Sequence, residues 1–242
     1  MSDSSFVVTN QLLYMLVNTT NQRLLPYLEE VSLTSGQILR ESGSKITDLY
    51  FPQSARCSWL LVMSDKFTIE VTSTGSKGLT GLPAVLGNDF TKTRLIAQIP
   101  GTAIKLPTEI IKKEFEKGGN FQRIVLLYTQ TQLNQISQIA ACRSHHDIEQ
   151  RLARWLLLID DDTQQDTLPL TQKFISMMLG VRRATITEIA ISFQQQGIIK
   201  YSRGQITILD RSKLEGVACE CYDKIKAEYE LLLESKLLRK NK

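Results

Sequence analysis

The feature that most constrains the fold is a glycine at position 180, which separates two short amphipathic segments. The first segment is QKFISMML, and it follows Thr171, a residue type that favours the N-cap of a helix. Gly180 suits the left-handed conformation in which a helix ends before a tight turn. The second segment covers residues 182–196 and is also helical in its pattern. The sequence therefore predicts two helices joined by a tight glycine turn.

The predicted second helix has one apolar and one polar face. Apolar residues recur at i, i+3, i+4 and i+7, at Ile186, Ile189, Ala190 and Phe193. The opposite face and its N-terminal flank carry Arg183, Ala184, Thr185, Thr187 and Glu188. We expect the apolar face to be buried and the other face to be free for contacts.

A β-hairpin is predicted directly after the second helix. Gly197 ends the helical pattern, and IIKYSRGQITIL then indicates two strands that turn at Arg203–Gly204. A short helix, a glycine turn, a second helix and a hairpin make a winged helix–turn–helix. In that arrangement the second helix enters the major groove of DNA with its N-terminal end first.

Local charge agrees with a nucleic-acid partner, although the whole chain has a formal net charge of only +4. The basic residues between positions 173 and 213 are Lys173, Arg182, Arg183, Lys200, Arg203, Arg211 and Lys213. Only Glu188 and Asp210 oppose them, so seven bases against two acids leave a local excess of five. A winged helix used only for protein contacts is the alternative that the sequence leaves open.

Residues 31–107 have the texture of a β-sheet. Short runs with period-2 alternation are cut by Ser-Gly turns and by an Asp-Lys turn, which predicts an antiparallel sandwich or barrel. The glycine-rich stretch 75–89 is expected to be a loop with a short helical turn at most. One or two short helices are predicted before the strands, over residues 5–30.

Strand texture stops at Pro107. A short helix is predicted up to Gly118–Gly119, and a long helical segment without Gly or Pro then covers residues 120–143. Residues at a/d heptad spacing in this segment are Leu126, Leu133, Ile136 and Ala140. The stripe fits a dimer contact, and packing on the protein's own sheet is the alternative.

The remaining sequence is helical apart from the hairpin. A helix near residues 146–162 places Ile148, Leu152, Trp155, Leu156 and Ile159 on one face. Arg151 and Arg154 are expected on its other side, and the acidic stretch 160–166 as a solvated linker. A final amphipathic helix is predicted over about the last 30 residues.

No metal site or cofactor is predicted. The thiols of Cys219 and Cys221 would point to different sides of a helix, so this pair makes a poor metal clip, and buried inert thiols are expected. His145 and His146 are adjacent and are expected to diverge at a solvated helix start. No Cys/His, Ser/His or paired-carboxylate arrangement supports an enzyme.

The stretch LTQKFISMMLGVRRATITEIAISFQQQGIIKYSRGQITILD resembles the C-terminal DNA-binding segment of the Crp/Fnr superfamily of bacterial transcription regulators. The order of elements upstream is also similar to that superfamily. The resemblance implies an α+β chain with three parts: an antiparallel, jelly-roll-like β-roll sensor domain over residues 1–118, a dimerisation helix over 119–144, and a winged helix–turn–helix domain over 145–242. It implies double-stranded DNA and a second copy of the chain as partners, with RNA polymerase as a further one.

Individual DNA contacts follow from the same resemblance. Arg183 falls where many members have an arginine that reads guanine, whose O6 and N7 fit a guanidinium fork. Thr171, Gln172, Thr185 and Arg203 resemble phosphate-contacting positions, and Arg182, Ala184 and Thr187 complete the predicted interface. Glu188 departs from the usual pattern. Its carboxylate can accept from cytosine N4 or pair with Arg183 or a neighbouring arginine, and both interpretations stay open.

The sensor departs from the superfamily members that bind cyclic nucleotides. Those members have a Gly-Glu whose carboxylate binds the ribose and an Arg that binds the cyclic phosphate. Here Gly81–Leu82 stands in the first place and Arg94 in the second, and a leucine cannot accept the ribose hydrogen bond. We therefore predict a sensor that does not bind cAMP, and either an unknown small-molecule effector or none. A cyclic-nucleotide-responsive regulator is an alternative.

The absence of a long apolar run and of a signal-peptide pattern predicts a cytoplasmic protein without a membrane partner. The predicted function is that of a sequence-specific transcription regulator acting as a homodimer on a palindromic DNA site. A ligand-binding module whose winged helix contacts protein is the alternative from another class. The sequence does not identify an effector, an operator or target genes.

Overall fold

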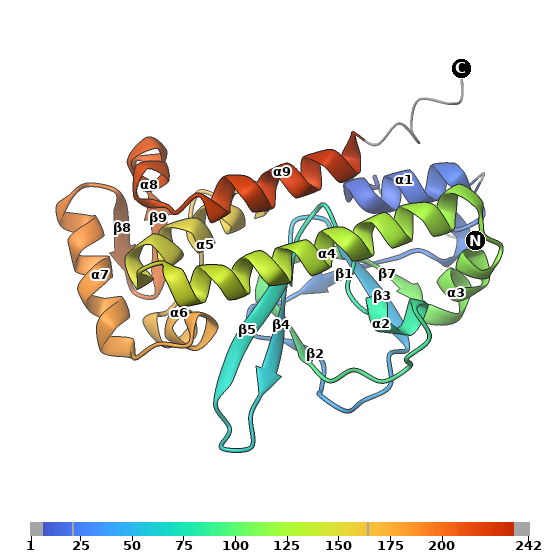
Figure 1. The fold of residues 1–242 in the computed structure, drawn as a ribbon, viewed down its shortest axis with the longest axis horizontal. Helices are drawn as coiled ribbons and strands as arrows, with labels where there is room; N and C mark the ends of the chain where they lie inside the picture. Colours follow the sequence, from blue (N-terminus) through green and yellow to red (C-terminus); the bar gives the residue numbers. More distant parts are fainter. Residues whose placement is uncertain (1–6, 21, 164, 235–242) are drawn as a thin grey trace.

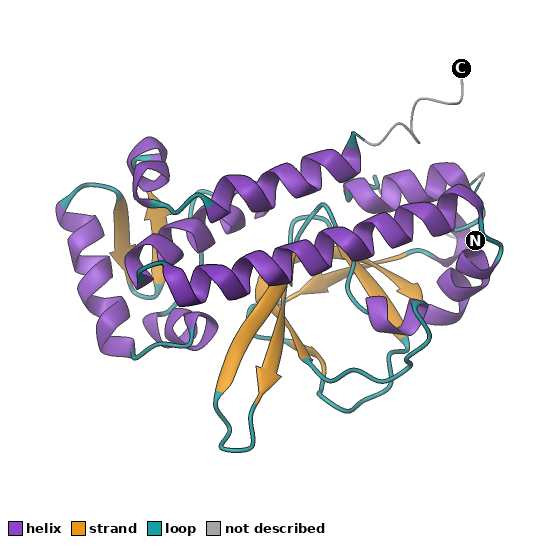
Figure 2. Ribbon diagram, viewed as in Figure 1, coloured by secondary structure: helices purple, strands orange, loops and turns teal. Residues whose placement is uncertain are grey.

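The computed structural model describes residues 7–20, 22–163 and 165–234. Along the chain it contains an antiparallel β-roll, a long helix and a helical C-terminal part with a two-stranded hairpin (Figures 1 and 2). The predicted α+β fold class is confirmed. Residues 1–6 and 235–242, at the outer limits of the predicted first and last domains, lie outside the described residues, and the domain limits stay a prediction.

The β-roll consists of two antiparallel sheets. Their strands are β1 (Glu29–Leu33), β2 (Ile38–Arg40), β3 (Asp48–Pro52), β4 (Arg56–Val62), β5 (Thr68–Thr74), β6 (Arg94–Ile99) and β7 (Gly101–Pro107). One sheet has the order β1-β7-β3 and the other β2-β6-β4-β5. The strands occupy the alternating runs that predicted them. The hairpin of β4 and β5 extends away from the long helix (Figure 1).

Short helices surround the roll. They are α1 (Gln11–Thr19), the 3-10 turn η1 (Leu25–Tyr27), α2 (Leu82–Val85) and α3 (Thr108–Glu116). The buried Asn10 fixes α1 on the roll, because its Oδ1 accepts from the N–H of Leu13 at 2.9 Å and caps the helix. Its Nδ2 donates to the carbonyls of Pro52 at 2.8 Å and Gly78 at 2.9 Å. All these polar groups are thus satisfied in the interior.

The long helix α4 (Gly119–His145) has 27 residues and crosses the molecule (Figure 1). One face is buried on the roll and includes Phe121, Ile124, Val125, Tyr128 and Ile139. The predicted heptad stripe lies elsewhere on the helix: Leu126 is 48% exposed, Leu133 60% and Ile136 36%, and Ala140 is exposed as well. The alternative in which this stripe packs on the protein's own sheet is therefore wrong.

The C-terminal part begins directly after α4. Its elements are α5 (Ile148–Thr163), α6 (Gln172–Leu179), α7 (Arg183–Gln195), β8 (Ile199–Ser202), β9 (Gln205–Ile208), α8 (Arg211–Val217) and α9 (Cys221–Leu233). Helix α9 turns back and lies beside α4 (Figure 1). The two helices, the turn and the hairpin appear in the predicted order.

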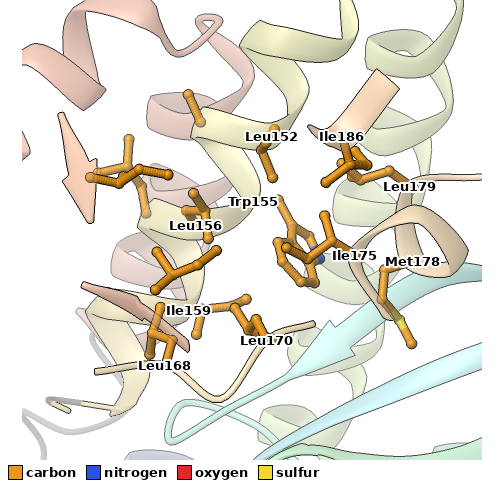
Figure 3. Close-up of a cluster of buried hydrophobic side chains, with 14 of the residues drawn as sticks. Leu152, Trp155, Leu156, Ile159, Leu168, Leu170, Ile175, Met178, Leu179 and Ile186 are labelled. Carbon is orange, nitrogen blue, oxygen red and sulfur yellow. The ribbon is translucent and has the colours of Figure 1, made fainter. Parts of the chain in front are cut away.

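Helix α5 forms the centre of a core that the roll and the C-terminal part share. Figure 3 shows Trp155 and Leu156 of α5 amid apolar side chains of α6, α7 and the segment after α5. The same cluster includes Leu60, Ile96 and Ile99 from β4 and β6 of the roll. Burying apolar area on both sides of α5 holds the two parts of the chain together.

Arg151 and Arg154, which were predicted on the polar side of α5, are buried in the structure. Arg151 is only 8% exposed and Arg154 only 4%. The guanidinium of Arg151 donates to the carbonyl of Leu179, at the end of α6, at 2.7 Å. The apolar periodicity of one helix cannot reveal a second packing partner on its polar side.

The predicted solvated linker over residues 160–166 is wrong for its first part, whereas Asp166 at its end is exposed and lies outside any helix. Asp160, Asp161 and Asp162 belong to the last turns of α5. Asp160 and Asp161 form ion pairs with Arg211 of α8, and Asp162 pairs with the buried Arg56 of β4. Gln164 lies outside the described residues. These ion pairs connect α5 to β4 and α8, which are distant from it in sequence.

The predicted single C-terminal helix is broken, and the break changes the interpretation of the cysteines. Residues 218–220 separate α8 from α9, so Cys219 stands in the break and Cys221 begins α9. Their thiols therefore do not diverge around a helix. His146 follows the end of α4, not the start of a helix, and is half-buried. Only Cys57 lies apart in the roll, where burial raises the pKa of its thiol to about 12 and keeps it unreactive.

We predict that Gly180→Ala lowers the free energy of unfolding by about 2–4 kcal/mol. Gly180 has φ +69°, and a Cβ at this position would lie 2.5 Å from Cδ1 of Ile69 in β5. Left-handed strain of roughly 1 kcal/mol adds to an overpacking cost of about 1–3 kcal/mol. Urea denaturation followed by circular dichroism measures the change.

Gly216→Ala is the matched control, because Gly216 lies inside α8 with open space at its Cβ. This substitution is expected to stabilise the protein by about 0.5–1 kcal/mol. Equal unfolding free energies for wild type and Gly180→Ala would contradict the contact between β5 and the glycine turn.

Candidate nucleic-acid interface

The turn between α6 and α7 has the geometry that the sequence predicts. Thr171 caps α6, since its Oγ1 accepts from the N–H of Phe174 at 3.2 Å. Gly180 ends α6 in the left-handed conformation, and its N–H donates to the carbonyl of Met177 at 3.3 Å. Helix α7 then starts at Arg183. Two helices are thus held at a fixed angle by local bonds and by the shared core.

Helix α7 presents one face to solvent. Ile186, Ala190 and Phe193 are buried and Ile189 packs on the same core, as the pattern predicts. Residues of the predicted DNA-facing side have different exposures: Arg182, Arg183, Ala184 and Glu188 are exposed, and Thr185 and Thr187 are half-buried. The outer face of α7 is therefore open along its first turns.

The N-terminal end of α7 has a positive electrostatic potential that no side-chain cap offsets. The N-cap residue is Arg182, and no side chain accepts a hydrogen bond from the first turn of the helix. The N–H groups of this turn therefore face solvent with the positive end of the helix dipole. Arg182 and Arg183 add two full charges at the same place. Phosphate groups are favoured there.

Hydrogen bonds join α6, α7 and the hairpin at their solvent side. The hydroxyl of Thr187 lies 2.9 Å from Oε1 of Gln172 and 3.1 Å from the carbonyl of Arg183, and both are acceptors. The backbone N–H of Gln172 donates to the hydroxyl of Tyr201 in β8 at 3.0 Å. Thr187 therefore positions α6 against α7. The side-chain amide of Gln172 and the hydroxyl of Thr171 remain able to donate to a phosphate.

The wing, defined as β8, β9 and the turn between them, is a two-residue hairpin. Ser202 pairs with Gln205, and the turn residues Arg203 and Gly204 have φ +49° and +78°. Positive φ at both positions is typical of a type I′ turn. The turn thus places the exposed side chain of Arg203 at the tip of the wing.

Ion pairing separates the basic residues of this region into two groups. Arg211 binds Asp160 and Asp161, and Lys213 binds Asp210. The exposed basic residues without an ion pair among the described residues are Lys173, Arg182, Arg183, Lys200 and Arg203. The sequence count of seven available bases is therefore too high, since Arg211 is held by α5. The unpaired group lies on α6, α7 and the wing.

Glu188 is exposed on α7 and has no ion pair within 4.0 Å among the described residues. Arg183 in particular is not its partner. Of the two interpretations of Glu188 that the sequence leaves open, the intramolecular pair is thus absent from this structure. Its carboxylate is free to accept a hydrogen bond from a base.

The two predicted effector positions do not form a joint polar site. Leu82 begins α2 and is 5% exposed within the apolar cluster of the roll. Arg94 pairs with Glu41 at 2.8 Å. Next to Leu82, the hydroxyl of Tyr128 donates to the carbonyl of Leu79 at 2.8 Å and accepts from its N–H at 3.0 Å. Tyr128 thus joins α4 to the segment that precedes α2.

Helices α6 and α7 with the wing, and the unpaired basic residues on them, have the architecture of a winged helix–turn–helix. Residues 150–217 match the sequence model of the Crp-like helix-turn-helix domain. The chain therefore contains a Crp-like helix-turn-helix domain, and it shares its overall fold with solved structures of Crp/Fnr-type regulators.

Solved structures with the same fold include a transcriptional regulator of the Crp/Fnr family from Eubacterium rectale. It is 21% identical, with a TM-score of 0.67 over 85% of this chain and 96% of that one. FixK2 from Bradyrhizobium japonicum is 15% identical, with a TM-score of 0.67 over 79% of this chain and 98% of its own.

The c-di-GMP responsive global regulator CLP of Xanthomonas campestris is 14% identical, with a TM-score of 0.61 over 80% of this chain and 99% of its own. Such identities show a shared fold. The comparison with curated protein sequences gives no match. Among the described residues, none of the helices has the length and apolarity that crossing a membrane requires.

Some residues of the interface were not predicted from the sequence. The hydroxyl of Tyr201 in the wing accepts a hydrogen bond from the first residue of α6. Asp160 and Asp161 pair with Arg211, so its charge is not available on the surface of α6, α7 and the wing. The alternation of β8 marks Tyr201 as a side chain on one face, but it does not show which helix that face meets. The acidic partners of Arg211 precede it by about 50 residues, beyond the range of any local pattern.

We predict that Arg211→Ala lowers the free energy of unfolding by about 1–2 kcal/mol, between the values of exposed and buried ion pairs. Its guanidinium holds Asp160 and Asp161 and also donates to the hydroxyl of Tyr222 at 2.8 Å. Affinity for DNA at a temperature where both proteins are folded is expected to be unchanged. A fall in affinity as large as that of Arg203→Ala would contradict this assignment.

Proposed function

We propose that the chain is a sequence-specific transcription regulator that acts as a homodimer on a palindromic DNA site. The observation that carries this proposal is the uncapped N-terminal turn of α7, with exposed Arg182 and Arg183 and no ion pair to either among the described residues. The helix dipole, the free N–H groups and the two arginines all favour the binding of a negatively charged group there.

Direct base contacts are assigned to the first turns of α7. Arg183 has a planar fork that matches guanine O6 and N7, and Ala184 next to it leaves room for close approach. Glu188 lies one turn further on the same exposed side and can accept from cytosine N4. The base preference is therefore expected to include a guanine and a cytosine in each half-site.

Phosphate contacts frame these residues on both sides. The amide of Gln172, the hydroxyls of Thr171 and Thr185, and Arg203 at the tip of the wing are the proposed donors. Such contacts fix the position of the duplex without reading its sequence. The wing and the start of α6 are joined through Tyr201 and Gln172, so the two sets of contacts move together.

The second copy of the chain is assigned to the exposed stripe of α4. Leu126, Leu133, Ile136 and Ala140 repeat at heptad spacing, and three of them are apolar side chains at least 36% exposed. A helix of 27 residues is about 40 Å long, enough for a coiled-coil contact over several turns. Two-fold symmetry then predicts half-sites about one helical turn apart.

Regulation by cAMP is not part of the proposal. Leu82 is buried in an apolar cluster, Arg94 is paired with Glu41, and Tyr128 is bonded to Leu79, which precedes α2. An unknown effector and a contact with RNA polymerase stay predictions. CLP is described as c-di-GMP responsive, but this property belongs to CLP and is not proposed for this chain.

We predict that Arg183→Ala weakens binding to the selected DNA site by about 1–3 kcal/mol and relaxes the preference at one base pair. The site is first obtained by selection from random duplexes with the wild-type protein. Fluorescence anisotropy then measures affinity for the site and for random DNA over a series of salt concentrations.

Arg203→Ala is the matched control on the wing. It is expected to lower the affinity for the selected site and for random DNA by the same factor. The slope of log K against log salt concentration is expected to fall in magnitude by about 1. If Arg183→Ala lowered the affinity for the selected site and for random DNA equally, the base contact would be refuted. If the wild type bound no duplex at low salt, the alternative of a winged helix for protein contacts would replace this proposal.

We predict that Leu133→Glu converts the dimer into a monomer, because two carboxylates would face each other across the symmetric contact. Analytical ultracentrifugation measures the mass, and affinity for the palindromic site is expected to fall with it. Leu86→Glu is the control, since Leu86 is an apolar side chain of the roll that is 46% exposed. A dimer that persists in Leu133→Glu would place the contact elsewhere.

A further inference from the structure

Four side chains of metal-binding type meet where α4 ends and α9 begins. Cys142 lies in the last turn of α4, His146 follows that helix, and Cys219 and Cys221 flank the start of α9. The three thiols and a ring nitrogen of His146 all lie within 4.8 Å of one another. The two pairs are more than 70 residues apart in sequence, so only the tertiary fold brings them together.

The distances between these atoms fit one tetrahedral ion. Zinc bonds of about 2.3 Å to sulfur and about 2.0 Å to nitrogen place neighbouring ligand atoms roughly 3.5–3.8 Å apart. Sγ of Cys142 lies 3.5 Å from Sγ of Cys219, and Sγ of Cys221 lies 3.7 Å from Nδ1 of His146. These two distances match edges of such a tetrahedron, and the other distances between the ligand atoms are at most 4.8 Å.

Neighbouring side chains hold two of the four residues in place. Nε2 of His146 lies 2.9 Å from a carboxylate oxygen of Glu220, so that Nδ1 is the ring nitrogen directed at Cys221. A carboxylate that orients a histidine in this way is the usual support of a zinc ligand. The amide of Gln138 also donates to Sγ of Cys221 at 3.0 Å and holds this sulfur at the cluster.

Burial makes the site closed. Cys142 is fully buried, Cys221 is 1% exposed and Cys219 4%, and the side chain of His146 is 11% exposed. Three thiolates and one imidazole supply all four positions of a tetrahedral zinc ion and leave none for a substrate. The donor set and geometry are those of structural zinc sites rather than of Mg²⁺ or Ca²⁺, which prefer oxygen.

We propose that Cys142, His146, Cys219 and Cys221 bind one Zn²⁺ ion per chain and clamp the end of α4 to the start of α9. The break between α4 and α5 lies at His146 and Asp147, so the ion is bound at the point where the winged helix leaves the long helix. Arg151, one turn into α5, donates to the last residue of α6. The ion therefore fixes the direction in which α5 and the winged helix continue from α4.

Other chemistry of the cluster is less compatible with its geometry. A disulfide has an S–S bond of about 2.0 Å, whereas Sγ of Cys142 and Sγ of Cys219 lie 3.5 Å apart and all the cysteines are free. An iron–sulfur cluster has several irons and sulfides between its ligands. Four ligand atoms within 4.8 Å of one another enclose a single ion.

The first test is the metal content of the full-length protein. Elemental analysis after gel filtration is expected to give one zinc per chain. Replacement by Co²⁺ is expected to give thiolate-to-metal charge transfer and the strong visible bands of tetrahedral cobalt. Removal by a chelator should lower the melting temperature, because a ligand bound only to the native state stabilises it.

Variants test the assignment of the four ligands. Cys219→Ser and His146→Ala are expected to lose the zinc and the cobalt spectrum. Cys57→Ser and His145→Ala are the matched controls and are expected to keep both, because Cys57 lies in the roll and His145 is exposed next to His146. Retention of one zinc by Cys219→Ser and His146→Ala would refute the site.

Glu220→Gln provides a test that does not depend on the folding of a ligand variant, since the side chain of Glu220 is 56% exposed. It is expected to bind one zinc with about 10–100-fold lower affinity in competition with a chromophoric chelator. Three outcomes would overturn the proposal: wild-type protein that binds neither zinc nor cobalt, iron with acid-labile sulfide, or a Cys142–Cys219 disulfide. The readouts are independent of DNA binding, so this proposal and the proposed function fail separately.

Discussion

The rest of the structure depends on the burial of α5 between the roll and the winged helix. Trp155 packs in the common core, and its indole N–H donates at 3.0 Å to the carboxylate of Glu70 in β5, which also accepts from Ser58 at 2.6 Å. Burial raises the pKa of Glu70, and these hydrogen bonds with the charge of Arg56 oppose the rise. Because the apolar core and the polar contacts both involve α5, neither part of the chain can turn relative to the other without exposing apolar surface or leaving buried polar groups unpaired.

This arrangement brings the roll into direct contact with the helix–turn–helix. Ile69 of β5 approaches the turn at Gly180, and Arg151 of α5 donates to the carbonyl of Leu179 at the end of α6. The proposed zinc ion would fix the same region from the end of α4. A change in the roll that moved β5 or α4 would therefore act directly on the helix–turn–helix.

The local features of the winged helix could be predicted from the sequence. The cap at Thr171, the left-handed Gly180, the buried stripe of α7 and the type I′ turn at Arg203–Gly204 each depend on neighbouring residues. The strands of the roll and the exposed heptad stripe of α4 followed from periodicity in the same way. The contribution of Arg211 to the basic face could not be judged, because its acidic partners in α5 precede it by about 50 residues. The burial of Arg151 and Arg154 was hidden as well, since the periodicity of α5 does not show which distant segments pack on its polar side.

By itself, then, the sequence determined the order of the elements, the faces of the helices and the turn chemistry, because backbone preferences and hydrophobic periodicity act over a few residues. Only the tertiary structure decided which charges remain free for DNA and which cysteines meet a histidine. The break between α8 and α9 turns Cys219 and Cys221 toward Cys142 and His146, and no local pattern marks that encounter. Ion pairs and metal ligands are contacts through space, so they depend on how the core brings distant segments together.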